Sequence, residues 1–104
     1  MIRVERSPEY FADLMRIDDF FSIEMESPKA ALKMIRGIEN TVGYLEERPE
    51  LGKCYEFEGM KTPYRFLVFE RFIIFYVVRK DTVIVARVFD TRMEYISELF
   101  PSLK

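Results

Sequence analysis

Three arginines and one tyrosine within residues 64–95 could carry chemistry: Arg65, Arg87, Arg92 and Tyr95. A guanidinium group is planar and permanently charged, so it stabilises negative charge that develops on a phosphate. A tyrosine can transfer a proton or stack on a nucleic-acid base. The function therefore depends on whether the fold brings these four side chains together.

The chain has 104 residues, no histidine and a single cysteine, Cys54. This composition excludes histidine-dependent triads and histidine metal sites, and we expect neither a metal nor a cofactor. One cysteine cannot form an internal disulfide, which favours a reducing, cytoplasmic setting. We expect no signal peptide and no membrane span, because the N-terminus lacks an apolar segment and no apolar run is long enough.

The formal net charge of −2 is unevenly distributed. Residues 1–60 carry 8 basic and 13 acidic side chains, a net of −5, whereas residues 61–92 carry 7 and 3, a net of +4. The last twelve residues carry 1 and 2, a net of −1. Bulk charge does not indicate a polyanion-binding protein. The second segment is compatible with a local basic face, and equally with arginines that keep a strand-rich half soluble.

Two helices are predicted after a short strand at residues 2–5. Each begins with a serine and a proline, Ser7-Pro8 and Ser27-Pro28. The serine can accept from first-turn amides, and proline has the backbone angle that the first helical position requires. Apolar residues then recur at helical spacing and predict one buried face per helix. These residues are Tyr10, Leu14, Ile17, Phe21 and Met25 in the first helix, where Phe11 and Met15 widen the stripe, and Ala31, Met34, Ile35, Ile38, Val42 and Leu45 in the second.

The gap between the two helices is short, so they are expected to form an antiparallel hairpin. Gly37 and Gly43 each weaken the second helix by about 1 kcal/mol. Either they allow a close approach to a sheet or they are simply poor helix residues. Pro49 ends the helix, and Pro49-Glu50-Leu51-Gly52 predicts a turn.

Three apolar runs at residues 64–69, 72–78 and 82–89 predict strands, with hairpin tips at Glu70-Arg71 and Arg79–Asp81. The middle run is apolar throughout, which predicts burial on both faces of the sheet. One face would hold the helical hairpin. The other face would be covered by the C-terminal helix, by a loop or by a partner.

The remaining segments complete the predicted order β-α-α-β-β-β-α. Residues 53–63 predict a loop or an irregular strand, and residues 91–99 are compatible with a helix that Pro101 ends. We therefore predict an α+β fold in which the helical hairpin packs on a small, mainly antiparallel sheet. Residues 1–104 are expected to form one domain. The sequence leaves open which edge of the sheet the first strand joins.

The ordered set of motifs resembles the RelE/ParE superfamily, the toxin components of type II toxin–antitoxin pairs. The resemblance covers nearly the whole chain, and it depends on element order, spacing and length rather than on one specific motif. The matching segments are Ser27-Pro28-Lys29-Ala30-Ala31, Pro49-Glu50-Leu51-Gly52, Tyr64-Arg65-Phe66-Leu67-Val68, Phe72-Ile73-Ile74-Phe75-Tyr76 and Val88-Phe89-Asp90-Thr91-Arg92-Met93-Glu94-Tyr95.

The resemblance implies catalytic roles for Arg65, Arg92 and Tyr95, as in relatives that cut mRNA on the ribosome. Our strand assignment adds Lys61 and Arg87 as substrate-binding residues near the same surface. Structural roles are the alternative: Arg65 as a solvent-facing strand position and Tyr95 as a cap on the core. Arg87 is alternatively an exposed strand position or a partner of an acidic residue. The acidic candidates are Glu56, Glu58 and Asp90.

This chain departs from many members of the superfamily at two positions. Asp90-Thr91 stands where they have His-Gly, and Met93 where they have another arginine. The first difference removes one acid/base group. A site without histidine would rely on charge stabilisation and on the ribosome for its geometry.

Three functions are compatible with the resemblance. The first is a toxin that cleaves ribosome-bound mRNA and arrests translation and growth. The second is a ParE-like toxin that inhibits DNA gyrase without chemistry of its own, and the third is an inactive member that acts with its antitoxin as a repressor. The sequence leaves open whether the protein is an enzyme. Plasmid stabilisation is a role associated with such pairs.

In each case the resemblance implies a cognate antitoxin, in a hetero-oligomer or beside a homodimer. The dense apolar content of a thin fold predicts a groove for a partner segment. The residues that suggest this groove are Phe57, Phe66, Phe69 and Phe100.

Overall fold

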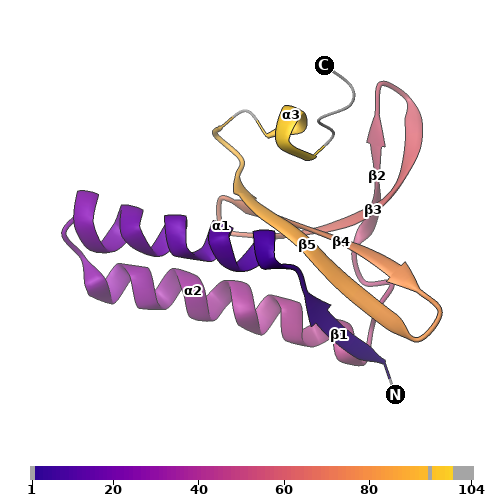
Figure 1. Ribbon diagram of the computed structural model, residues 1–104, viewed down its shortest axis with the longest axis horizontal. Helices are drawn as coiled ribbons and strands as arrows, with labels where there is room; N and C mark the ends of the chain where they lie inside the picture. Colours follow the sequence, from indigo (N-terminus) through magenta and orange to yellow (C-terminus); the bar gives the residue numbers. More distant parts are fainter. Residues whose placement is uncertain (1, 94, 100–104) are drawn as a thin grey trace.

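The computed structural model describes residues 2–93 and 95–99. Two long helices pack side by side on one face of a five-stranded sheet, and a short third helix lies against the other face (Figure 1). The predicted α+β fold is confirmed. Phe100 and Pro101, which the sequence assigned to a groove and to a helix end, lie outside the described residues.

The sheet has the strand order β1-β5-β4-β3-β2. Its strands are β1 (Arg3–Arg6), β2 (Lys53–Phe57), β3 (Met60–Phe69), β4 (Phe72–Arg79) and β5 (Thr82–Asp90). The pair β1–β5 is parallel and the other pairs are antiparallel. The structure thus places the first strand at the edge beside β5, which the sequence had left open. Strand β1 pairs only with residues 82–85, so the second half of this edge of β5 is not paired with β1.

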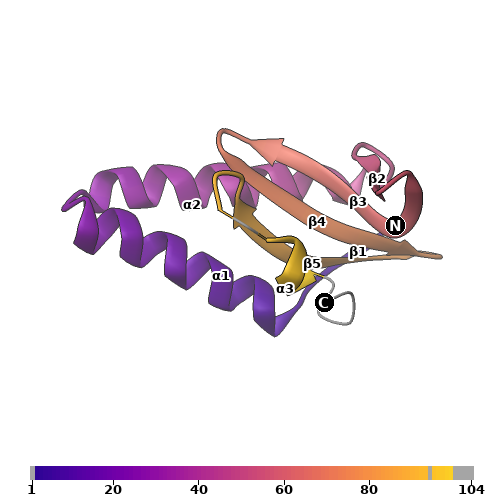
Figure 2. The same ribbon diagram turned by 90° about the horizontal axis from the view of Figure 1, so that it is seen from above.

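The helices begin where the sequence predicts. Helix α1 (Pro8–Asp19) continues as a π-helix (Phe20–Glu24), and α2 (Pro28–Gly43) continues as a 3₁₀ turn (Tyr44–Glu46). The Ser7 and Ser27 hydroxyls accept from the amides of Tyr10 and Ala30 at 3.0 and 3.2 Å. Figure 2 shows the two helices running antiparallel. Helix α3 (Ile96–Leu99) is shorter than the predicted segment 91–99. Within the described residues, no helix is long and apolar enough to span a membrane.

Of the two alternatives predicted for residues 53–63, the structure shows the irregular strand and not the loop, with a register shift between Cys54 and Glu56. Residues 53–63 supply β2 and the start of β3, and the two strands are joined by a tight turn at Glu58-Gly59. Both turn residues have positive φ, 52° and 79°. Two consecutive residues of this kind match the turn that follows the natural twist of a hairpin. The mixed composition of this edge hairpin conceals its strand pattern.

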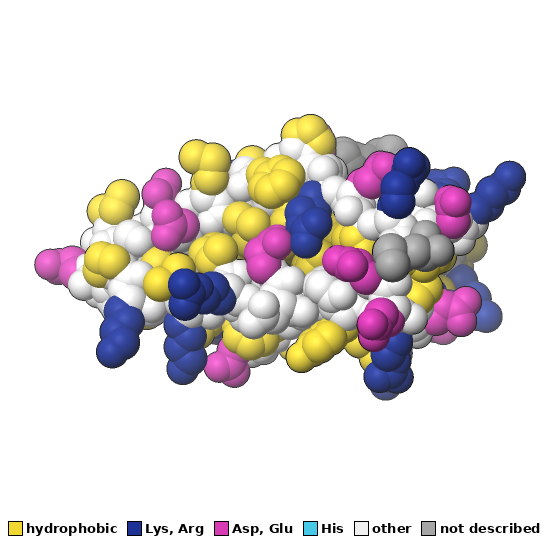
Figure 3. Space-filling view, turned by 90° about the horizontal axis from the view of Figure 1, so that it is seen from below, with side chains coloured by type: hydrophobic (Ala, Val, Ile, Leu, Met, Phe, Trp, Pro, Cys, Tyr) yellow, Lys and Arg dark blue, Asp and Glu magenta, His cyan; other side chains and the backbone are white. Residues whose placement is uncertain are grey.

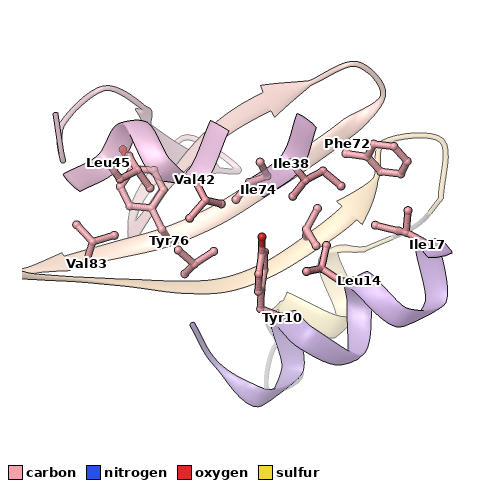
Figure 4. Close-up of a cluster of buried hydrophobic side chains, with 12 residues drawn as sticks. Tyr10, Leu14, Ile17, Ile38, Val42, Leu45, Phe72, Ile74, Tyr76 and Val83 are labelled. Carbon is pink, nitrogen blue, oxygen red and sulfur yellow. The ribbon is translucent and has the colours of Figure 1, made fainter. Parts of the chain in front are cut away.

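Two apolar clusters hold the sheet, one on each face. The larger cluster lies between the helices and the sheet, and Figure 4 shows Tyr10, Leu14 and Ile38 pointing into it. Gly37 allows α2 to approach β3 closely, because a Cβ there would lie 1.9 Å from the Phe69 ring. At Gly43 a Cβ would meet nothing within 4 Å, so this glycine is only a weak helix former.

The smaller cluster lies on the opposite face, where α3 covers the sheet. Ile73, Phe75, Phe89 and Leu99 are buried there, with four tyrosine and phenylalanine side chains packed around them. Burial of β4 on both faces follows the prediction, and the C-terminal helix supplies part of the second cover.

Candidate functional site

Arg65 lies on the helix-covered face of the sheet. It stands opposite Tyr76 in the β3–β4 pairing, and Tyr76 belongs to the larger cluster. The Arg65 Nη1 donates to the Gly52 carbonyl at 2.7 Å, and the Gly52 amide donates to the Tyr76 hydroxyl at 2.8 Å. Arg65 thus fastens the turn after α2 to the sheet. A Cβ at position 52 would lie 2.5 Å from the Phe66 carbonyl, so the turn requires glycine.

Arg87 is anchored by a carboxylate that the sequence did not indicate. Its Nε lies 2.8 Å from Asp13 Oδ2, its Nη2 lies 2.9 Å from Asp13 Oδ1, and the same Nη2 lies 3.2 Å from Glu98 Oε1. The predicted alternatives, Glu56, Glu58 and Asp90, are therefore wrong. The hydrogen bonds that Arg87 donates to Asp13 outweigh burial and raise the pKa of Arg87. Its guanidinium also lies 4.5 Å from the centre of the Phe89 ring.

Asp13 is the buried acidic residue of this surface, with only 2% of its side chain exposed. It projects from α1 onto the part of β5 that β1 does not reach. There its Oδ2 accepts from the Val88 amide at 3.0 Å, and Arg16 pairs with it from the solvent side. In the sequence Asp13 lies beside the apolar stripe of the first helix, and nothing marks it as buried.

Arg92 lies at the end of β5 in a second group of charges. Its Nε lies 3.6 Å from Asp90 Oδ1, and its backbone amide donates to the same oxygen at 2.9 Å. Arg71 approaches Asp90 from the other side, with Nε 3.0 Å from Oδ2, as an ion pair without hydrogen-bond geometry. The Arg71 guanidinium is enclosed by aromatic rings at 5.0–5.5 Å, those of Phe20, Phe21 and Phe72.

Tyr95 packs in the smaller apolar cluster. Its ring stacks on Phe89 at 5.6 Å between centroids and 12° between planes, and it meets Phe75 at 5.8 Å. Burial, followed by the neighbouring Tyr95 hydroxyl, raises the pKa of Tyr55. Lys61 is exposed on β3 opposite Glu56 of β2.

The structure therefore separates the predicted residues into groups. Arg87, Arg92 and Tyr95 lie around the end of β5, where Arg87 and Tyr95 both contact Phe89. Arg65 points from the opposite face of the sheet. It pairs across the strands with Tyr76, whereas Tyr95 contacts Phe75. Phe75 and Tyr76 are consecutive in β4, so their side chains point to opposite faces. The four side chains do not form one cluster.

A groove of about 800 Å³ lies between α1 with its π-helix and the end of β5. Of the phenylalanines that the sequence suggested for a groove, Phe57, Phe66 and Phe69 do not line it, and Phe100 lies outside the described residues. The apolar part of its lining is Ile17, Phe20, Phe21, Phe72, Val88, Phe89, Met93 and Tyr95. The charged part is Asp13, Arg16, Asp19, Glu24, Arg71, Asp90, Arg92 and Glu98.

The arginines of this groove are already paired. Arg16 pairs with the carboxylate of Asp13, which also binds Arg87 outside the groove lining, and Arg71 and Arg92 share the carboxylate of Asp90. A paired guanidinium attracts a phosphate less strongly than an unpaired one, since its charge is offset. Among the described residues, no group of His, Cys, Asp and Glu could hold a metal ion. The groove is better suited to an apolar segment than to phosphate chemistry.

Comparison with known proteins places the chain in a family. The family model described as "ParE toxin of type II toxin-antitoxin system, parDE" matches residues 4–95. This range runs from β1 to Tyr95 and includes every residue of the sheet except Arg3. No curated protein matches the sequence significantly.

Two solved structures share the fold. One is described as the chromosomal ParDE TA system from P. aeruginosa; it is 23% identical, with a TM-score of 0.71, and the match covers 85% of this chain and 94% of that one. The other is a RelB–RelE antitoxin–toxin complex from Methanococcus jannaschii; it is 18% identical, with a TM-score of 0.53, and the match covers 93% and 99%. At these identities the likeness establishes the fold.

Proposed function

The chain belongs to the ParE toxin family of type II toxin–antitoxin systems, and from this premise we propose that it acts by binding DNA gyrase rather than by cutting RNA. The observation that carries the proposal is the separation of the candidate catalytic residues. Arg65 faces the helices, while Arg87 and Arg92 are held by carboxylates at the end of β5. Cleavage of RNA by its own 2′-OH needs fixed positive charge around one phosphate. Cleavage of ribosome-bound mRNA, the first function predicted from the sequence, stays an untested alternative prediction.

The proposal is tested by inducing the chain in bacteria that lack an antitoxin. We expect growth arrest, induction of the SOS response and intact mRNA, because inhibited gyrase causes DNA damage without nuclease activity. The purified chain should inhibit supercoiling of relaxed plasmid by gyrase. The measurements are an SOS reporter, northern blots and a supercoiling assay.

Arg92→Ala and Tyr95→Phe distinguish the two active functions, with Arg79→Ala at the exposed end of β4 as the matched control. Discrete mRNA cleavage that Arg92→Ala abolishes and Arg79→Ala leaves unchanged would support the endonuclease and contradict our proposal. Growth without any arrest would contradict both and favour an inactive member.

We also infer that the chain is neutralised by a cognate antitoxin. Both solved structures described above come from toxin–antitoxin systems, and the groove beside β5 presents apolar side chains that a partner segment could cover. The product of the neighbouring reading frame should co-purify with the chain and restore growth. Full toxicity in the presence of every neighbouring gene product would contradict this inference.

A further inference from the structure

The outer face of the helical hairpin, opposite the sheet, carries exposed apolar side chains. Phe11 and Met15 of α1 are 51% and 68% exposed, and Leu32 of α2 is 51% exposed. Half-buried Ile35 lies one turn after Leu32. Figure 3 shows hydrophobic side chains gathered along this face between the helices. Scattered apolar residues are ordinary, but a contiguous row at a helix–helix seam marks an interface.

Charges of opposite sign flank this row. Asp18 and Asp19 lie on α1, whereas Lys29, Lys33 and Arg36 lie on α2, and all five are exposed. Within the described chain, none of them takes part in an ion pair of 4 Å or less. At the left of Figure 3, acidic side chains lie toward the upper edge and basic side chains toward the lower edge.

The two charged groups lie at the same level along the hairpin. The Tyr10 hydroxyl donates to Glu39 Oε2 at 2.6 Å, which sets residue 10 beside residue 39. Because the helices are antiparallel and rise equally per residue, residue 18 then lies beside about residue 31. The acidic group of α1 is therefore level with Lys29 and Lys33 of α2.

We propose that this face binds a second copy of the chain about a two-fold axis parallel to the seam. Such an axis places α1 of each copy over α2 of the other. Each residue keeps its position along the hairpin axis. Asp18 and Asp19 then meet Lys29 and Lys33 of the other copy twice, and Met15 meets Leu32 and Ile35. A two-fold interface requires a self-complementary surface, and this arrangement of charge and apolar contact has that property.

The size of the face indicates a modest affinity. Helix α1 and its π-helix contain 12 and 5 residues, a length of roughly 25 Å at about 1.5 Å per residue. Two helices side by side are roughly 20 Å wide. This footprint is at the low end for specific interfaces, so we expect dissociation in the micromolar range.

Paired charge reversals test the interface by analytical ultracentrifugation of the purified chain across a concentration series. Asp18→Lys with Asp19→Lys forms one variant, and Lys29→Glu with Lys33→Glu forms the other. Each alone places like charges together at both contacts and should weaken self-association by about tenfold or more. An equimolar mixture should form a mixed dimer as tightly as the native chain, since both contacts regain opposite charges.

Met15→Glu, in the apolar row, should also give a monomer, whereas Glu47→Lys at the far end of the hairpin should leave the dimer unchanged. Circular dichroism verifies that each variant is folded. A monomeric native chain at every concentration, or a mixture that fails to restore association, would overturn the proposal. Hydrogen-exchange protection of this face only with an antitoxin bound would assign it to that partner instead. These outcomes do not depend on the cellular target.

Discussion

A single carboxylate connects three elements of the molecule. Asp13 of α1 accepts from the Val88 amide of β5 and from Arg87, and Arg87 in turn pairs with Glu98 of α3. The edge of β5 beyond β1 would otherwise leave this buried backbone donor unpaired, which is costly. Asp13 therefore replaces the backbone acceptor that a longer β1 would have supplied.

Replacing Asp13 with alanine should reduce the free energy of unfolding by about 3 kcal/mol, since a buried guanidinium and an amide lose their partner. Urea denaturation measures the change, and exposed Asp19→Ala should alter stability by less than about 0.5 kcal/mol. In Asp13→Ala/Arg87→Met the combined loss should be smaller than the sum of the two single losses. Additive losses would show that the two side chains are not coupled.

At the scale of elements, two glycines distinguish close approach from weak helix propensity. The turn after α2 packs so tightly on β3 that Gly52 leaves no space for a side chain, whereas Gly43 at the end of α2 faces open space. The sequence indicates both glycines, but it does not show which one is required.

Gly52→Ala should destabilise the protein by about 2 kcal/mol, because the Phe66 carbonyl cannot move away without breaking the sheet. Gly43→Ala should instead stabilise it by about 0.5 kcal/mol through helix propensity. Thermal unfolding of both variants measures the difference. Equal effects of the same sign would contradict this assignment of roles.

For the whole molecule, buried tyrosine hydroxyls join the two helices to each other and the sheet to the turn after α2. Tyr10 bonds to Glu39 between the helices, and Tyr76 bonds to Gly52 between sheet and turn. Burial raises the pKa of both hydroxyls, and the Glu39 carboxylate raises that of Tyr10 further. Both groups thus hold their protons more tightly in the folded chain than in the unfolded one.

This linkage predicts a loss of stability in alkali. Below the unfolded-state pKa of about 10 the contribution is fully present, and it is lost as the pH rises from there through the higher folded pKa. The free energy of unfolding should therefore decline above pH of about 10. In Tyr10→Phe, measured by urea denaturation across the same pH range, the decline should be shallower. An identical slope would show that Tyr10 is not linked to folding.

The elements that depend on local pattern follow from the order of the residues alone. Serine–proline starts and apolar spacing gave both long helices, and the apolar runs gave β3, β4 and β5. The segment at residues 53–63 was left between a loop and an irregular strand, because an exposed edge strand needs no regular apolar alternation. The ordered set of motifs also led to the toxin superfamily, and the family match confirms it.

Which candidate residues meet depends on the three-dimensional fold. Arg65 and Arg87 are both mid-strand arginines, yet one fastens a turn under the helices and the other binds a carboxylate from α1. The face of the sheet from which each arginine points depends on strand register, including the irregularity between Phe75 and Tyr76 where β4 pairs with β5. The partners of both arginines come from distant segments of the chain. Local spacing encodes neither strand register nor pairing between distant segments. The sequence could therefore name the four side chains, but it could not show which of them lie close together.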